Sequence, residues 1–281
     1  MKVWIQGARP KTLPAAIAPV LVGTALAGDS LSLGHAALAL IVSLSLQIGV
    51  NYANDYSDGI RGTDAVRVGP VRITASGLAS ATSVKRAAFL SFLVAAIAGL
   101  VLAAASSWWL IGVGASAIVA AWGYTGGKNP YGYIGLGEIF VFIYFGLVAT
   151  IGTYYVQSGT IDRRSILAAI PVGLLACLIL AMNNIRDRAQ DAQVGKRTSA
   201  VRLGDKAARR WAVAMMLLAH LMPLTISWPA FFATALISPL SYSVARGLLV
   251  GASGNELIAY IARTGKLHIL YSSALSLGLL L

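Results

Sequence analysis

The chain has 281 residues, of which 57% are apolar and only 11% are charged, and its mean hydropathy is +0.74. This composition is typical of an integral membrane protein and argues against a soluble or disordered one. The net charge of +12 also occurs in nucleic-acid-binding proteins, so the positions of the charges along the chain must decide between these classes.

Long uncharged runs predict membrane-spanning helices. Residues 30–54, 139–161 and 165–185 each exceed the roughly 20 residues that a helix needs to cross the hydrocarbon core. Residues 87–127 and 211–245 are long enough for two crossings each. None of these runs shows the short alternating segments of a β-barrel, so we expect an all-α integral membrane protein.

Two of the runs must be divided, and two shorter segments complete the set. We place turns at Ser106–Ser107 and at Trp228–Pro229, where small or helix-stopping residues permit them. Shorter apolar stretches near 12–28 and 267–281 bring the total to nine transmembrane helices. We expect one transmembrane domain over residues 1–281.

The distribution of charge fits this arrangement. With the N-terminus inside, only Arg163 and Arg164 of the 22 Lys and Arg residues fall outside, as the positive-inside rule requires. We therefore attribute the basic character to topology and to an anionic ligand, and expect no nucleic-acid partner.

The first apolar segment is predicted to be a retained helix, and the single cysteine to have no disulfide or metal role. Residues 12–28 share a basic start and a small-residue end with signal peptides, but Pro14, Pro19 and the helices that follow favour a retained helix. Cys177 is the one cysteine of the sequence, so we expect neither a disulfide framework nor a cysteine metal site.

Half of the acidic residues are concentrated in two segments. Residues 51–64 and 183–198 hold five of the ten Asp and Glu residues, and both segments follow the inner ends of predicted helices. The five are Asp55, Asp58, Asp64, Asp187 and Asp191.

The spacing of these residues is helical. If the helices continue through their polar ends, Asn51, Asp55 and Asp58 share one side, and Asn183, Asp187 and Asp191 repeat the arrangement. Asp55 and Asp187 are 132 positions apart, with four helices between them. We infer a weak internal repeat of a four-helix unit, whose two halves present acidic patches to one cavity.

Acidic side chains one turn apart at a helix C-terminus disfavour one another, so a cation is expected to offset them. The alternative is that they are only solvated helix ends. Mg²⁺ is the natural cation, because one or two carboxylates and substrate phosphates usually hold it. Interleaved cations, among them Arg61 and Arg188, are suited to a diphosphate, although some of them serve only topology or lipid contact.

A third inner loop, residues 124–138, is rich in glycine and includes Lys128. Glycine allows close approach of the backbone to a ligand. Glu138 opens an otherwise uncharged helix, where it is either a functional group or an N-terminal cap.

Several motifs in this order resemble the UbiA superfamily of intramembrane prenyltransferases, over essentially the whole chain. The two aspartate-rich motifs read NDYSD and DRAQD. Resemblance to the menaquinone branch, closest to its actinobacterial members, rests on ARPKTLPAAIAPVLVGTAL, NDYSDGIRGTD, RVGPVRITASG, YTGGKNPYGYIGLGE and VGKRTSAVRLG.

The resemblance implies a UbiA-type bundle in a bacterial cell membrane, with its active site at the cytoplasmic face. It implies transfer of a polyprenyl chain from polyprenyl diphosphate to 1,4-dihydroxy-2-naphthoate, with loss of CO₂ and diphosphate, giving demethylmenaquinone. The implied catalytic residues, which hold Mg²⁺ on the diphosphate, are Asp55, Asp58, Asp187 and Asp191. The expected diphosphate-binding residues are Asn51, Asn54, Arg67, Arg72, Lys128, Asn184, Arg186, Lys196 and Arg197.

An allylic cation needs a dry cavity with electron-rich walls. The residues expected to face this cation or the acceptor are Asp64, Tyr52, Tyr56, Tyr124, Tyr144 or its neighbour Phe145, and Glu138. Aromatic residues in membrane helices more often serve packing or interface anchoring.

The sequence departs from the family pattern at two places. Gly195 stands where some members have a third carboxylate, and Lys128 lies one place earlier than the usual basic residue before Pro130. One rival interpretation is a UbiA-type transferase with another acceptor. Another is a cation-coupled transporter, but its acidic residues would lie near the membrane midplane.

Overall fold

The computed structural model describes residues 1–63, 69 and 71–281, and within these residues the regular structure is helical, without strands. The helices are α1 (Lys2–Ala8), α2 (Pro14–Leu26), α3 (Leu33–Arg61), α4 (Ala81–Ala105), α5 (Leu110–Gly123), α6 (Gly137–Val141), α7 (Ala149–Ser158), α8 (Arg163–Gln193), α9 (Ser199–Leu203), α10 (Asp205–Leu221), α11 (Trp228–Ala235), α12 (Ser238–Val250) and α13 (Gly254–Leu280). The prediction of an all-α protein is confirmed.

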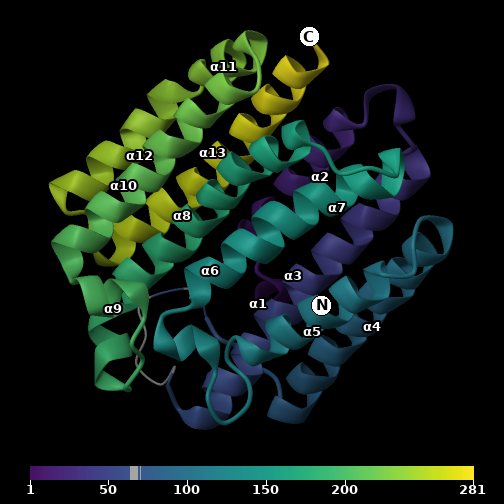
Figure 1. Ribbon diagram of the computed structural model, residues 1–281. Helices are drawn as coiled ribbons and strands as arrows, with labels where there is room; N and C mark the ends of the chain where they lie inside the picture. Colours follow the sequence, from purple (N-terminus) through teal and green to yellow (C-terminus); the bar gives the residue numbers. More distant parts are fainter. Residues whose placement is uncertain (64–68, 70) are drawn as a thin grey trace.

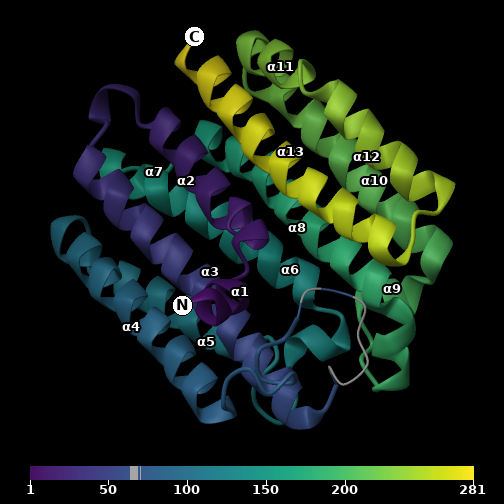
Figure 2. The ribbon, with the colours of Figure 1, turned by 180° about the vertical axis from the view of Figure 1, so that it is seen from behind.

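The long helices lie side by side in one bundle (Figure 1). Helices α4 and α5 form one edge and α10 to α12 the other, and the view from behind shows α2 and α13 between them (Figure 2). The end of α3, the start of α4 and the connections from α5 to α6 and from α8 to α10 gather at one end of the bundle, at the bottom of Figure 1, and the C-terminus lies at the other. We call the end where these connections gather the inner end.

Some helices of the bundle are long and apolar enough to cross a membrane. Among the described residues, four helices are long and apolar enough to cross a membrane: α3, α4, the continuous segment Gly137–Ser158, and α8. A fifth crossing results if α11 and α12, which meet at an angle of 56°, form one bent span. The chain is accordingly a multi-pass membrane protein.

Several helices extend beyond the uncharged runs that predict them. Helix α3 continues through its aspartates to Arg61 and α8 continues to Gln193, as the helical spacing of the acidic residues requires. Helix α13 begins at Gly254 rather than near 267, with Arg263 and Lys266 inside it. Hydropathy marks only the part of a helix that lies in the hydrocarbon core, and charged inner turns extend beyond it.

The turn predicted at Trp228–Pro229 is wrong in position. These residues are the first two of α11, which Ser227 caps by accepting a hydrogen bond from the backbone N–H of Ala230. The break lies earlier, at the 3₁₀ turn Met222–Thr225. Proline at the first positions of a helix starts it rather than stops it, because the N–H that proline lacks would have no helical partner there.

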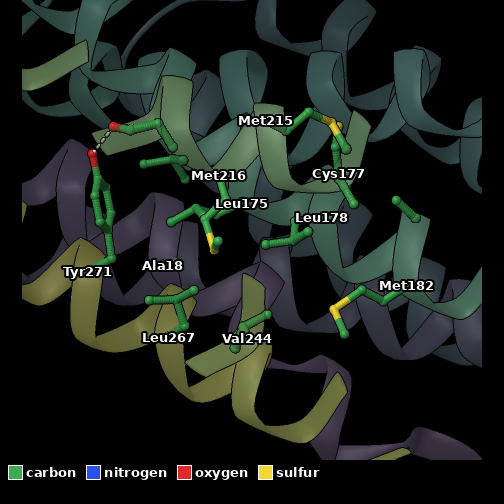
Figure 3. Close-up of a cluster of buried hydrophobic side chains, with 14 of the residues drawn as sticks. Ala18, Leu175, Cys177, Leu178, Met182, Met215, Met216, Val244, Leu267 and Tyr271 are labelled. Carbon is green, nitrogen blue, oxygen red and sulfur yellow. Dashed lines mark hydrogen bonds between the residues drawn. The ribbon is translucent and has the colours of Figure 1, made fainter. Parts of the chain in front are cut away.

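The main apolar core joins α8, α10 and α13, with contributions from α2 and α12 (Figure 3). Leu175, Leu178 and Met216 are buried completely or nearly so. The hydroxyl of Tyr271 donates to the carbonyl of Ala219 on α10, which satisfies this polar group inside the core (Figure 3). The core fixes α8, and with it the second aspartate-rich segment.

Between α6 and α7 the chain forms a π-helical segment, Phe142–Val148. Here Gly146 packs directly on Gly173 of α8: a Cβ added at Gly146 would lie 2.5 Å from the Gly173 Cα. Small residues permit this approach of two helix backbones. The contact holds the α6–α7 segment beside α8. Residues of this segment and of α8 line one cavity.

Candidate active site

A cavity of about 550 Å³ opens between α3, α5, α7 and α8 and reaches the N-terminal segment. At the inner end its walls carry charged and amide side chains. Toward the opposite end the lining becomes apolar, with Leu102 of α4, Leu110 of α5 and Val156 of α7. The cavity is therefore amphipathic along its length, charged at one end and apolar at the other.

Three of the predicted aspartates line the charged end. Asp58 projects from α3, and Asp187 and Asp191 project from α8. The structure thus brings the two aspartate-rich segments to one cavity. Asp55 is fully buried beside them but is not part of the cavity wall. Asp64 lies outside the described residues.

Asp58 is the most connected of these carboxylates. Only 3% of the residue is exposed. Its Oδ1 accepts hydrogen bonds from the Tyr133 hydroxyl at 2.7 Å and from the Lys196 Nζ at 3.2 Å. Its Oδ2 lies 3.6 Å from a guanidinium nitrogen of Arg72. A buried carboxylate requires such compensation, because its desolvation is costly.

The second segment is built differently. Arg186 binds the adjacent Asp187 through both carboxylate oxygens, with two contacts of 2.7 Å. Such a forked pair fixes the orientation of both side chains. Asp191 is buried, and its backbone carbonyl accepts the backbone N–H of Lys196 at 2.8 Å. This bond folds the chain back after α8 and directs Lys196 into the cavity.

Lys196 and Tyr133 form one charged unit with Asp58. The Lys196 Nζ also lies 4.6 Å from the centre of the Tyr133 ring. Burial lowers the pKa of Lys196, but Asp58, Tyr133 and Asp191 together outweigh this effect, so the net result is a raised pKa. Burial, followed by the charge of Asp58, raises the pKa of Tyr133. Lys196 is therefore a cation and Tyr133 a neutral hydrogen-bond donor at neutral pH.

The remaining predicted cations divide into two groups. Arg72 and Arg186 line the cavity together with Lys196. Lys128 and Arg197 are exposed on the surface of their loops, away from the cavity wall. Arg67 lies outside the described residues.

The amide side chains hold the wall of the cavity together. Asn51 donates to the Ala8 carbonyl at 2.8 Å and to the Thr12 hydroxyl at 2.9 Å, which fastens the N-terminal segment to α3. Asn54 accepts from the Thr125 hydroxyl at 2.8 Å. Asn184 donates to Glu138 at 2.9 Å. All three asparagines also line the cavity.

Aromatic rings form another part of the cavity wall. Tyr124 and Tyr144, both predicted from the sequence, line the cavity together with Phe145. Phe140 stacks on Tyr131 with the ring centres 3.9 Å apart, and both rings line the same wall. These rings lie between the charged and the apolar parts of the cavity.

Three side chains predicted to face the cation or the acceptor are directed elsewhere. The hydroxyl of Tyr52 donates to the Trp4 carbonyl of α1, and Tyr56 stacks against Trp122. Glu138, in the first turn of α6, accepts from Asn184 and from the Ser199 hydroxyl. The helical period explains why the two tyrosine side chains point away from the cavity. One side of α3 faces the cavity, and the side that carries Tyr52 and Tyr56 packs on α1, α4 and α5.

The inner loops are joined to one another by side chains. Arg61, at the end of α3, donates to the carbonyls of Thr125 and Gly127. Gln190 of α8 donates to the Thr63 carbonyl at 3.0 Å. Arg202 of α9 donates to the Ile134 carbonyl at 2.8 Å. These bonds join the inner loops to one another at the charged end of the cavity.

The residues present suit a divalent cation. Among the described residues, no cluster of three His, Cys, Asp or Glu side chains is close enough to hold a metal by itself. Mg²⁺ seldom needs one, because it keeps water ligands and completes its shell with substrate phosphates. Asp58 and Asp187, facing one cavity from two helices, provide the oxygen ligands that Mg²⁺ prefers, and the neighbouring cations suit phosphate oxygens.

Several wall residues were not predicted. Arg9 and Thr12 of the N-terminal segment line the cavity, as do Tyr131 and Tyr133 of the third loop. Arg9 adopts a left-handed backbone conformation, with φ of 51°, which is uncommon outside glycine. Two sequence signals were available: a basic residue just before the first apolar helix, and tyrosines inside a glycine-rich loop.

The fold and the cavity define a multi-pass helical membrane protein with a buried, doubly acidic, cation-rich pocket. Residues 16–263 match the UbiA prenyltransferase family, and the chain belongs to this family.

The similarity extends to named relatives along nearly the whole chain. The 1,4-dihydroxy-2-naphthoate octaprenyltransferase of Mycobacterium tuberculosis is 46% identical over 277 residues, which cover 97% of this chain and 95% of that protein. The protein of the same name from Escherichia coli is 37% identical, covering 100% of this chain and 96% of its own length.

Solved structures share the fold at low sequence identity. The apo structure of a UbiA homolog from Aeropyrum pernix K1 superposes with a TM-score of 0.75 at 16% identity, covering 95% of this chain and 97% of that chain. A UbiA homolog from Archaeoglobus fulgidus, bound to GPP and Mg²⁺, gives 0.68 at 15% identity, covering 98% and 99%.

Proposed function

We propose that the protein transfers a polyprenyl chain from polyprenyl diphosphate to 1,4-dihydroxy-2-naphthoate in menaquinone biosynthesis. The observation that carries this proposal is the amphipathic cavity, which offers a charged end to a diphosphate and an apolar length to its chain. The relatives that are 37–46% identical over nearly full length bear the name of this activity.

The charged end would bind the diphosphate. Asp58, Asp187 and Asp191 would hold Mg²⁺, and the bound ion supplies positive charge that stabilises the leaving diphosphate. Arg72, Arg186 and Lys196 donate to the phosphate oxygens, and the same contacts strengthen as negative charge develops there during ionisation. Asp55 does not line the cavity and is not among these ligands.

Bond cleavage leaves the electron pair of the C–O bond on the diphosphate and an allylic cation on the prenyl chain. The rings of Tyr124, Tyr131 and Tyr144 are suited to stabilise this cation, each by about 1 kcal/mol or more in a desolvated site. The connected inner loops and the surrounding helices exclude the water that would otherwise quench it.

The acceptor then attacks with its ring carbon that bears the carboxylate. A bond forms from this carbon to the first carbon of the prenyl chain, and the carboxylate leaves as CO₂, returning its bonding electrons to the ring. The step is redox-neutral, so its product is the quinol form of demethylmenaquinone. The remainder of the prenyl chain lies along the apolar part of the cavity, past Leu110 and Val156.

We further propose nine membrane spans. Helices α2, α5, α10 and α13 would add four to the five crossings that length and hydropathy support. With the inner end in the cytoplasm, Arg163 and Arg164 remain outside, which accords with the positive-inside rule. The active site would then face the cytoplasm in a bacterial inner membrane. The matching positions of acidic residues on α3 and α8 support the internal four-helix repeat.

An assay of the detergent-solubilised protein tests the reaction. The protein is incubated with polyprenyl diphosphate, 1,4-dihydroxy-2-naphthoate and Mg²⁺, and the lipid extract is analysed by mass spectrometry. We expect a prenylated naphthoquinol and equimolar CO₂. A second reaction with 4-hydroxybenzoate as acceptor separates the leading assignment from a UbiA-type transferase of other specificity. Prenylation of 4-hydroxybenzoate alone would refute the naphthoate assignment.

A further inference from the structure

Asp55 differs from the other aspartates in what its carboxylate contacts. It is 0% exposed, and the cavity wall includes Asp58 but not Asp55. Asn51, Asp55 and Asp58 lie on the same broad side of α3, so the difference arises from the neighbouring chain and not from the helical period. The carboxylate of Asp55 is covered by the segment that follows α3.

Both oxygens of this carboxylate bind backbone N–H groups of the segment that follows α3. The Ile73 N–H donates to Oδ2 at 3.1 Å and the Thr74 N–H donates to Oδ1 at 2.8 Å. Arg9 lies 3.9 Å from Oδ2 and balances the charge. Hydrogen bonds to an ionised acceptor are about twice as strong as neutral ones, so Asp55 fastens this segment firmly to α3.

Two glycines make room for the fastened segment. A Cβ on Gly59, one turn beyond Asp55, would lie 2.6 Å from the Thr74 Cγ2. A Cβ on Gly7 of α1 would lie 2.7 Å from the Ile73 Cδ1. Ile73 itself is fully buried in the cluster that joins α3, α4 and α5. The segment thus docks closely on α3, with Asp55 as its polar anchor.

The anchored segment carries a cation of the cavity. Arg72 immediately precedes Ile73, and its guanidinium lies 3.6 Å from Asp58 at the charged end. The Arg72 carbonyl accepts from the backbone N–H and the hydroxyl of Ser76, at 3.0 and 2.7 Å. The peptide unit that joins Arg72 to Ile73 is therefore held at both its carbonyl and its N–H.

We propose that Asp55 is a positioning residue, which anchors Ile73 and Thr74 so that Arg72 reaches the diphosphate, and that it is not a ligand of the metal. This inference rests on the proposed function for the identity of the anion. It divides the first aspartate-rich motif into two roles: Asp58 faces the ligand, and Asp55 holds the segment that supplies a second contact to it.

If Asp55 is an anchor and not a metal ligand, its substitution should weaken pyrophosphate binding without changing the Mg²⁺ requirement. A metal ligand would change both. In Asp55→Asn, one of the two carboxylate acceptors becomes an N–H donor, so one backbone N–H loses its partner. We expect the dissociation constant for inorganic pyrophosphate, measured by calorimetry in Mg²⁺, to rise about tenfold, which corresponds to the loss of one charged hydrogen bond. The Mg²⁺ concentration for half-maximal pyrophosphate binding should change less than about twofold.

Three further variants complete the experiment. Asp58→Asn should shift the Mg²⁺ dependence itself. Gly59→Ala, which displaces Thr74 while keeping the carboxylate of Asp55, should reproduce the pyrophosphate defect of Asp55→Asn. In the Arg72→Gln background, Asp55→Asn should add little further loss, because both substitutions remove the same contact.

Hydrogen exchange of peptides covering residues 71–79 provides a readout that needs no substrate. We expect faster exchange in Asp55→Asn and Gly59→Ala than in the wild type, with Asp29→Asn, an exposed acidic residue, as the unchanged control. Unchanged exchange in Asp55→Asn overturns the anchor, and a shift of Mg²⁺ dependence equal to that of Asp58→Asn overturns the assignment against metal binding. Failure of the wild type to prenylate naphthoate would refute the proposed function while the exchange result stands.

Discussion

The hydroxyl of Tyr133 donates a 2.7 Å hydrogen bond to Asp58, although the two residues come from segments 75 positions apart. The same ring lies under Lys196 and near Arg61, at 4.6 and 5.2 Å from its centre. Tyr133 thus connects the glycine-rich loop to the end of α3 and to the loop after α8. One phenol orients the carboxylate that faces the ligand.

Tyr133→Phe keeps the ring contacts and removes only the hydrogen bond. We expect kcat to fall about tenfold, the effect of one hydrogen bond to a charged group, while the thermal unfolding temperature changes little. Steady-state kinetics and differential scanning fluorimetry measure the two quantities. Unchanged kcat would show that Asp58 is oriented by its cations alone.

Asp187→Asn removes a charge from the second aspartate-rich segment without a change of shape. We expect activity to fall by a factor of about 10² or more, since electrostatic stabilisation of a leaving group has this magnitude. Addition of EDTA to the wild type should abolish turnover, and excess Mg²⁺ should restore it. Full activity in EDTA would contradict a metal-assisted departure of the diphosphate.

Gly146→Ala tests the contact between the π-helical segment and α8. The added methyl group would lie 2.5 Å from the Gly173 Cα, a backbone atom that cannot rotate away, so we expect a loss of about 1–3 kcal/mol in stability. Gly112→Ala on α5 is the matched control, because its Cβ would meet no described atom within 4 Å. Equal unfolding temperatures for the two variants would refute the close packing.

Asp162 caps α8 at the end of the bundle opposite the active site. Its side chain accepts from the Ser165 N–H at 2.7 Å and from the Tyr154 hydroxyl at 3.0 Å. Burial raises the pKa of Asp162, but these hydrogen bonds outweigh it and the net effect is a pKa below the ordinary 3.8. The stabilisation is therefore present above about pH 4 and is lost as the pH falls through the folded-state pKa.

Asp162→Ala should cost about 1 kcal/mol at neutral pH, and Asp162→Asn should cost less. Thermal unfolding between pH 3 and pH 7 measures both. The difference between wild type and Asp162→Ala should shrink at the acidic end, and a difference independent of pH would argue against an ionised cap.

Sequence patterns predicted the features that depend on local periodicity. The apolar runs located most of the long helices, although the turn near Trp228 and the start of α13 were misplaced. The position of Asp58, Asp187 and Asp191 near predicted inner helix ends indicated that they share one end of the bundle. The helical period alone did not separate Asp55 from Asp58, because both lie on the broad polar side of α3. The difference arises from the returning segment at Ile73 and Thr74, which is a tertiary contact.

The position of the N-terminal segment is a second feature that the sequence did not predict. Arg9 and Thr12 enter the cavity wall because Asn51 binds the Ala8 carbonyl and the Thr12 hydroxyl. Nothing in the local sequence predicts which helix a short segment will cross.

The π-helical segment has a consequence for how the cavity keeps its shape along the bundle. Phe140, Tyr144, Val148, Gly152 and Val156 all line it, at intervals of four residues. In an ideal α-helix, positions four apart drift by about 40° around the axis at each step, so the last of these would point away from the first. The wider turn at Phe142–Val148 rotates in the opposite sense and keeps the stripe straight. A one-residue deletion there would let the segment relax towards an ordinary α-helix and lose this compensation, so the length of the segment matters to the cavity more than the identity of its amino acids.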